Sequence, residues 1–223
     1  MTIAGQFHPG TFIDAFRFIG DHPGLLLSKA GQHLELSGAA LGIALLLALP
    51  LGLWLGHRHR GLFFAASVAN LGRALPSLVL IAFGLTVFGI GFWNNTVALV
   101  VLAVPSILTN AYFGIDGVDR DVVDAARGMG MSELQVLLRV ELPLALPLVL
   151  AGIRIAAIFV IATATIAAIA GGGGLGDIMV NQATYGLEGV VGAAYCVSAL
   201  AFAAALGLSY IGRAATRRPV PVP

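Results

Sequence analysis

The chain has 223 residues, of which 58% are hydrophobic and only 10% are charged, and its formal net charge is +1. A soluble domain carries about a quarter charged residues, so this composition excludes an ordinary soluble enzyme and predicts an all-α, polytopic membrane helical bundle. The few basic residues give no indication of nucleic-acid binding, and the single cysteine, Cys196, excludes an internal disulfide.

Residues 1–35 form a mixed N-terminal segment. Apolar residues recur at helical spacing over residues 11–19, at Phe12, Ile13, Phe16 and Ile19. Pro23 separates this stretch from a second piece over residues 25–35. We expect the segment to be extracytoplasmic and to include an interfacial helix that lies along the membrane surface.

Five apolar stretches follow, each long enough to cross a bilayer, which takes roughly 20 residues. They cover residues 36–56, 62–90, 96–115, 148–170 and 189–211. Residues 91–95 are expected to form a short outer turn. Together the stretches predict a transmembrane domain over residues 36–212, followed by a cytoplasmic tail over residues 213–223.

Basic residues predict the orientation of these spans. One side of the five-span arrangement carries Arg58, Arg60, Arg120, Arg127, Arg139, Arg213, Arg217 and Arg218, against Arg17 and Lys29 on the other. Since basic loops stay in the cytoplasm, the N-terminus is expected outside and the C-terminus inside. The run 57–60 marks this inner side and is too short for a metal or nucleic-acid motif. The long polar loop over residues 116–143 is then cytoplasmic.

This loop contains the most charged and helix-prone segment of the chain. We expect a short helix over residues 122–127, a glycine break at Gly128 and Gly130, and a second helix that begins at the N-cap Ser132 and stops at Pro143. The second helix carries an apolar stripe formed by Leu134, Leu137 and Leu138. Such a stripe indicates either a partner groove or a helix lying flat on the lipid surface.

The segment resembles the cytoplasmic coupling motif of ABC-importer permeases, which reads Glu-Ala-Ala, three residues, Gly, nine residues, Ile-x-Leu-Pro. The matching positions are Asp124, Ala125, Ala126, Gly130, Val140, Leu142 and Pro143. Asp124 replaces the usual Glu, and Val140 replaces the usual Ile. The resemblance implies that this segment docks on a separate ATPase, with Ala125, Ala126 and Gly130 in close contact with its groove and Asp124 as a polar anchor.

Other runs narrow the resemblance to permeases of osmoprotectant importers, which carry quaternary amines such as glycine betaine, choline and carnitine. These runs are 73–77, 117–119, 125–131, 140–147, 152–154 and 162–165, with the glycine stretch that ends at Asp177. The resemblance implies a five-span core with a fold like that of methionine permeases. It also implies a cytoplasmic ATPase dimer, a second permease subunit, identical or homologous, and an extracytoplasmic substrate-binding protein. A methionine-type amino-acid importer permease is the alternative within this class.

The sequence contains no catalytic constellation. Without a Walker motif the chain is not expected to bind ATP, so ATP belongs to the partner subunit, and no metal or other cofactor is expected here. A secondary transporter or channel is the alternative from another class. Such a protein needs intramembrane acids or a repeat architecture, and the predicted spans contain neither Asp nor Glu.

Candidates for the transport pathway or its gate are Arg73, Pro76, Thr163, Thr165, Gly173 and Gly174. Arg73 either lines the pathway beside a kink at Pro76 or caps a broken helix. The two threonines either line the pathway or donate hydrogen bonds to preceding carbonyls. The glycine stretch 171–176 lacks the Gly-Lys-Ser/Thr of a phosphate loop and is expected to be the flexible outer end of the fourth span.

Overall fold

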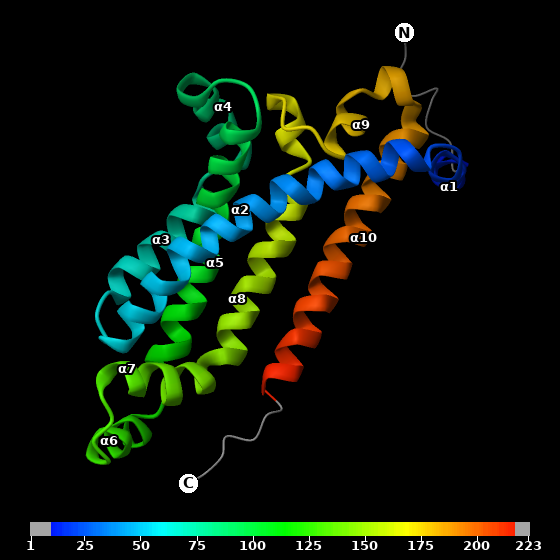
Figure 1. The fold of residues 1–223 in the computed structure, drawn as a ribbon. Coiled ribbons are helices and arrows are strands. Elements are labelled where there is room, and N and C mark those ends of the chain that lie inside the picture. Colours follow the sequence, from blue (N-terminus) through cyan, green and yellow to red (C-terminus); the bar gives the residue numbers. More distant parts are fainter. Residues whose placement is uncertain (1–9, 217–223) are drawn as a thin grey trace. The chain divides into compact units, whose positions relative to one another are not determined.

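The computed structural model describes residues 10–216, apart from the side chains at positions 73, 215 and 216, and in this range it contains helices and no strand. The longer helices are α1 (Thr11–Asp21), α2 (Pro23–His57), α3 (Leu62–Ala74), α4 (Ser77–Phe88), α5 (Phe92–Asp116), α6 (Arg120–Gly128), α8 (Leu142–Thr163) and α10 (Gln182–Thr216) (Figure 1). Shorter elements are α7 (Glu133–Val136), a π-helical turn (Leu137–Glu141), a 3-10 helix (Ile166–Ala170) and α9 (Gly176–Val180). The predicted all-α class is confirmed; Arg217, Arg218 and the rest of the predicted tail beyond residue 216 lie outside the described residues.

Four helical stretches of the described chain are long and apolar enough to cross a membrane, and α3 with α4 makes a fifth if the two are halves of one broken span. The expected single helix over residues 62–90 is therefore wrong in detail. Leu75 has an extended backbone and Pro76 is the N-cap of α4. Proline removes an N–H donor and disfavours helical geometry in the residue before it, which explains the break. Arg73 is in the last turn of α3, and its side chain lies outside the described part of the structure.

Other boundaries also differ from the sequence prediction: α8 ends at Thr163 rather than at residue 170, and α10 begins at Gln182 rather than at residue 189. Helix α2 begins at Pro23 and continues without a break through residues 35 and 36, where a change from interfacial segment to span was expected. Proline is favoured at a helix start because its missing N–H would be unpaired there anyway. Pro143 does not stop a helix but is the second residue of α8, in its first turn.

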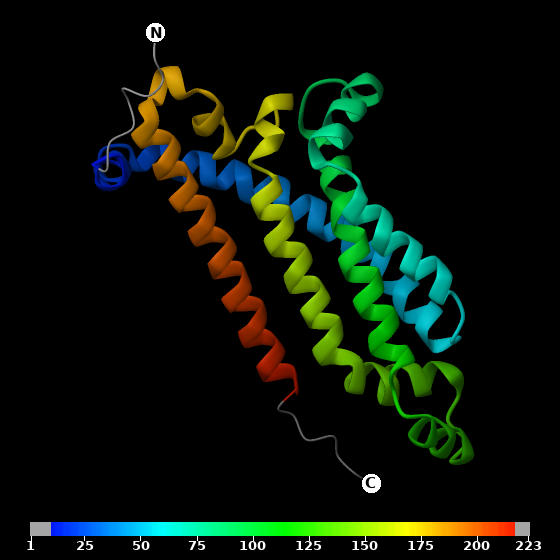
Figure 2. The ribbon, with the colours of Figure 1, turned by 180° about the vertical axis from the view of Figure 1, so that it is seen from behind.

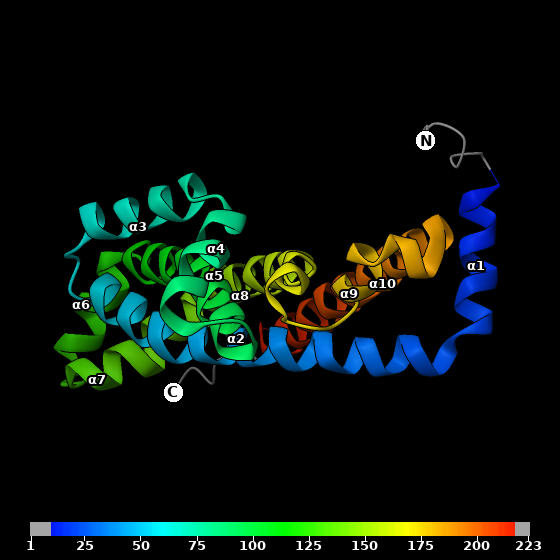
Figure 3. The same cartoon turned by 90° about the horizontal axis from the view of Figure 1, so that it is seen from above.

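The described chain forms two compact units, and the first comprises residues up to 41, 76–100 and 158–203. Within it, α1 runs across the start of α2 (Figure 3). A small core gathers Ile81, Ala98 and Ala170. Residues 91–95 are not simply a turn, because α5 begins at Phe92 and buries Asn94 and Asn95. The Asn95 amide donates to the carbonyl oxygens of Gly91, at 2.8 Å, and Ala170, at 3.2 Å.

The second unit comprises residues 42–75, 101–157 and the chain from 204 onward. Its core brings α5 and α8 together through Ala111, Ile115, Ala145 and Val149, and Figure 2 shows these helices beside each other. Helices α2 and α5 approach closely because α2 carries two glycines one turn apart, Gly52 and Gly56. A Cβ atom at Gly56 would lie 2.7 Å from the carbonyl oxygen of Tyr112. Small residues at this spacing let membrane helices pack backbone to backbone.

Candidate functional site

The first part of the predicted coupling segment is helix α6, in the second unit. The Asp119 carboxylate caps its start by accepting a 2.9 Å hydrogen bond from the Asp121 N–H. Val123 and Ala126 turn into a small apolar cluster with Val118 and Val136. Asp124 and Ala125 lie on the opposite, exposed side of the helix. Within the predicted coupling motif, Ala126 therefore packs inside the chain, whereas Asp124 and Ala125 face outward.

A tight turn connects α6 with α7, and Gly130 makes it. Its φ of +83° lies in the left-handed region, which favours glycine. The Met131 N–H donates to the Ala126 carbonyl oxygen at 3.3 Å and closes the turn. Ser132 then starts α7 as predicted: its Oγ accepts from the Gln135 N–H at 3.4 Å, and the Gln135 side chain accepts from the Ser132 N–H at 2.8 Å. This reciprocal capping box fixes where the second helix begins.

A π-helical turn joins α7 to the long helix α8. The Leu142 N–H donates to the carbonyl oxygen of Leu137, five residues back. Val140 packs on the cluster around Val136, and Leu142 packs on the core around Ala145. Pro143 is exposed and comes shortly after the π-helical turn, in the first turn of α8. The helical path from Glu133 to Thr163 is thus continuous and connects the loop directly to a membrane span.

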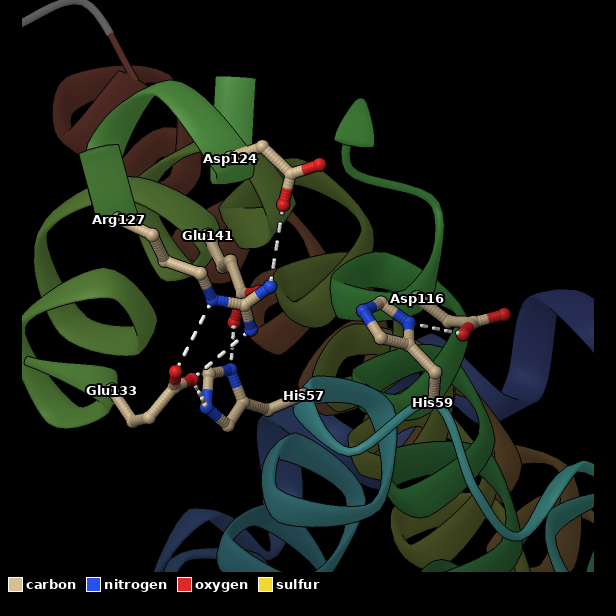
Figure 4. Close-up of polar contacts among 7 residues, drawn as sticks. All are labelled: His57, His59, Asp116, Asp124, Arg127, Glu133 and Glu141. Carbon is tan, nitrogen blue, oxygen red and sulfur yellow. Dashed lines mark hydrogen bonds and ion pairs between the residues drawn. The ribbon is translucent and has the colours of Figure 1, made fainter. Parts of the chain in front are cut away.

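Four ionisable side chains from separate elements meet beside this segment (Figure 4). The guanidinium of Arg127 donates to both carboxylate oxygens of Glu133, at 3.2 and 3.0 Å. His57, the last residue of α2, has Nε2 3.0 Å from Glu133 Oε2 and Nδ1 2.6 Å from Glu141 Oε2. Arg127 also contacts Asp124 at 3.4 Å. We name Arg127, Glu133, His57 and Glu141 the polar bridge.

The polar bridge passes from an exposed surface to a buried end. Asp124 and Glu133 are exposed, whereas the side chain of His57 is 7% exposed and that of Glu141 is 0% exposed. Hydrogen bonds from Arg127 to Glu133 raise the pKa of the guanidinium further above its ordinary value. Ion pairs of this kind are worth little at the surface but are costly to break once buried. Glu141 is therefore the member that depends most on its partner.

A cavity of about 520 Å³ lies next to the polar bridge. It is lined by Trp54, His57, Arg58, His59, Arg127, Glu133, Leu134 and Leu137. Arg58 lies over the Trp54 ring at 5.8 Å from its centroid, and His59 forms a separate 2.9 Å contact with Asp116. The described residues contain no cluster of side chains suited to a metal ion.

The predicted pathway residues of the glycine stretch lie in the first unit, against α2. Gly173 and Gly174 both have positive φ, at +71° and +78°. The Gly174 N–H donates to the Gln32 side chain at 3.1 Å, and a Cβ there would come within 3.1 Å of His33. Lys29 and Asp177 form an ion pair at 2.5 Å. The glycine stretch is thus tied to the N-terminal part of α2 by polar contacts.

The two threonine candidates differ in their surroundings. Thr163 is the last residue of α8 and is buried. The Thr165 hydroxyl donates to the Ala162 carbonyl oxygen at 2.7 Å, which is the local use foreseen as the alternative to lining a pathway. Pro76, by contrast, belongs to the break before α4.

Sequence reasoning missed His57 and Glu141 as site residues. His57 was interpreted only as part of a basic run that marks the inner side of a span. Glu141 carries the stronger signal, since it is an acidic residue within the apolar run 140–148. Nothing local pairs the two, because they are 84 positions apart.

Several apolar helices long enough to cross a membrane, with a capped polar loop between two of them, define a multi-pass membrane protein. The chain belongs to the family of binding-protein-dependent transport system inner membrane components, whose sequence profile matches residues 48–216. It is a multi-pass inner-membrane protein and a non-catalytic permease subunit of an ABC transporter, in which the ATPase is a separate chain.

Relatives of known role agree with this assignment. The glycine betaine/carnitine/choline transport system permease protein OpuCB of Bacillus subtilis is 38% identical over 82% of this chain and 85% of its own length. The choline transport system permease protein OpuBB of the same organism is 36% identical over 92% and 93%. Among solved structures, the inward-facing MetNI methionine ABC transporter has a TM-score of 0.75 and covers 88% of this chain and 99% of its own, at 23% identity. The structural similarity confirms the expected methionine-permease-like architecture. Because the identity is low, it shows the fold alone.

Proposed function

We propose that this permease carries a quaternary amine, such as glycine betaine, choline or carnitine, into the cell. The observation that carries the proposal is the 36–38% identity to permeases named for these substrates, over most of both chains. The likeness to the methionine transporter is at 23% identity and supports the shared fold rather than a shared substrate. The amino-acid alternative is therefore less favoured.

We propose further that α6 and α7 are the coupling element on which the ATPase docks. Asp124, Ala125 and Gly130 are exposed and available for contact. Ala126 is only 2% exposed, so we assign it to packing inside this chain rather than to the ATPase groove implied by the resemblance. Val140 and Leu142 pack on the apolar clusters next to the start of α8, and Pro143 lies in the first turn of α8. Because α8 continues from α7, a push on the loop reaches a membrane span.

The proposal also includes an orientation in the membrane and a set of partners. The coupling loop carries Arg120, Arg127 and Arg139, and the orientation rule counts Lys and Arg rather than net charge; this supports a cytoplasmic loop with the N-terminus outside and the C-terminus inside. Partners would be a cytoplasmic ATPase dimer that binds the ATP, a second permease subunit and an extracytoplasmic substrate-binding protein. Membrane lipid would surround the spanning helices.

The substrate proposal is tested by uptake into proteoliposomes that contain the permease with its ATPase. ATP is supplied on the ATPase side and the binding protein on the other. Labelled glycine betaine, choline, carnitine and methionine are compared, each with and without ATP. We expect ATP-dependent uptake of at least one quaternary amine, competed by its unlabelled form, and no uptake of methionine. Accumulation of methionine alone would move the substrate to the amino-acid class, and flux that ignores ATP would favour a channel or secondary transporter.

A further inference from the structure

His57 is the one side chain of the polar bridge that belongs to helix α2. It is 8% exposed and closes the C-terminal turn of this helix, directly after Gly56. One ring nitrogen faces Glu133, at the start of α7, and the other faces Glu141, at the end of the π-helical turn. The imidazole therefore connects α2 with both ends of the short helical segment that follows Gly130.

The two ring nitrogens of His57 face two different carboxyl groups. Nδ1 lies 2.6 Å from Glu141 Oε2, and Nε2 lies 3.0 Å from Glu133 Oε2. Both distances are within hydrogen-bonding range, so one imidazole contacts two acidic side chains at once. Glu141 Oε1 has no partner among the described residues, which leaves His57 as the residue that compensates the buried carboxylate.

Apolar packing accompanies this polar connection. Leu53 of α2 and Leu137, which follows α7, both pack on the core around Ile115. The cavity of about 520 Å³ is lined by Trp54 and Arg58 near the end of α2 and by Arg127 and Leu134 of the coupling element. Beside this cavity, the imidazole of His57 supplies a direct polar contact from α2 to Glu133 of the coupling element.

We propose that His57 is a positioning residue of the coupling machinery, through which movement of α6 and α7 is passed to the span α2 as well as to α8. The inference rests on the proposed coupling role of α6 and α7. An ion-paired and partly buried link is stiff in one geometry, so it transmits displacement where a water-filled gap would absorb it. The coupling element would then drive two spans, one through its backbone and one through His57.

The test compares His57→Leu, Glu141→Met and the double variant in reconstituted complexes. Each single change strands a charged or polar partner and is expected to lower thermal stability, whereas the double change replaces both partners by apolar groups and is expected to restore it. We expect the double variant to assemble with the ATPase and to melt like the wild type. Its ratio of substrate transported to ATP hydrolysed should fall about tenfold, a usual size for coupling between sites.

His59→Leu serves as the matched control, since His59 lies two residues further on, in the turn after α2, and contacts Asp116 instead of the coupling element. Its transport per ATP should stay near the wild-type value. A double variant of His57 and Glu141 that melts and transports like the wild type would overturn the inference and leave only a structural role. If transport is ATP-independent already in the wild type, it is the proposed function that fails, and the two failures are thereby distinguished.

Discussion

Replacing Gly130 by tryptophan is expected to reduce ATP-driven uptake at least about tenfold while the chain still folds and inserts. The position has a φ of +83°, where any side chain costs about 1–2 kcal/mol. No atom lies within 4 Å of a Cβ built there, so a side chain can leave the backbone at this position without meeting a neighbour. It projects from the turn onto which the ATPase is proposed to dock. Uptake and co-purification of the ATPase measure the two effects.

Gly128→Ala is the control for this change. Gly128 is the last residue of α6, also has open space around its Cβ and does not have a positive φ. It should transport nearly as the wild type does. Gly130→Ala adds the strain of the left-handed backbone without the bulk and should fall between the two. Wild-type uptake by an assembled Gly130→Trp complex would contradict a docking role for this turn.

Gly56→Leu is expected to have the largest effect on stability. Its Cβ would lie 2.7 Å from the Tyr112 carbonyl oxygen and 2.8 Å from the Ile115 Cβ, and backbone atoms of α5 cannot rotate away. Helices α2 and α5 would have to separate, which we expect to cost about 3 kcal/mol and to lower the Tm by roughly 10 °C. Because His57 is the next residue, the polar bridge should be lost as well. Thermal melting in detergent measures the change.

Gly42 offers a matched position on the same helix. It also lies in α2, and no atom comes within 4 Å of a Cβ built there. Gly42→Leu should therefore leave the Tm almost unchanged. Equal losses at positions 42 and 56 would show that the effect does not depend on the contact with α5, and no loss at position 56 would argue against the close contact between α2 and α5.

Local signals in the sequence predicted much of this fold. Long apolar stretches identified the spans, and helical spacing identified α1. Ser132 and Gly130 act over three or four residues, which is why the capped turn of the coupling segment was predictable. At Pro76 the sequence left open a kink or a broken helix, and the structure shows the break. Pro143 was over-weighted, because a proline in a first turn is tolerated.

The polar bridge could not be predicted from the sequence, because tertiary packing brings its members together. His57 and Glu141 come together only because Gly56 lets α2 approach α5, and α5 in turn packs on the start of α8. A charged residue at the end of a span is ordinarily explained by the membrane interface alone. The buried side of Ala126 is likewise a matter of packing against Val136, which the motif spacing does not reveal.

Several other expectations from the sequence remain predictions. The domain limits at residues 35, 36, 212 and 213 and the pathway roles of Arg73, Pro76, Thr163, Gly173 and Gly174 belong to this group. The Thr165 hydroxyl donates to the carbonyl oxygen of Ala162 in the last turn of α8. The polar contacts between the glycine stretch and α2 restrain that loop. A role of the loop in gating remains a prediction.

Cross-linking tests most directly whether α6 and α7 dock on the ATPase. The chain has one cysteine, so a Cys196→Ser background gives single-cysteine variants. Met129→Cys lies in the turn after α6, where the native side chain is 72% exposed, and Ile90→Cys lies between α4 and α5, where it is 81% exposed. With a thiol-to-amine cross-linker in membranes that contain the whole complex, we expect the ATPase to be captured from position 129 and not from position 90. Capture from position 90, or no capture from position 129, would contradict both the docking site and the cytoplasmic placement of the loop.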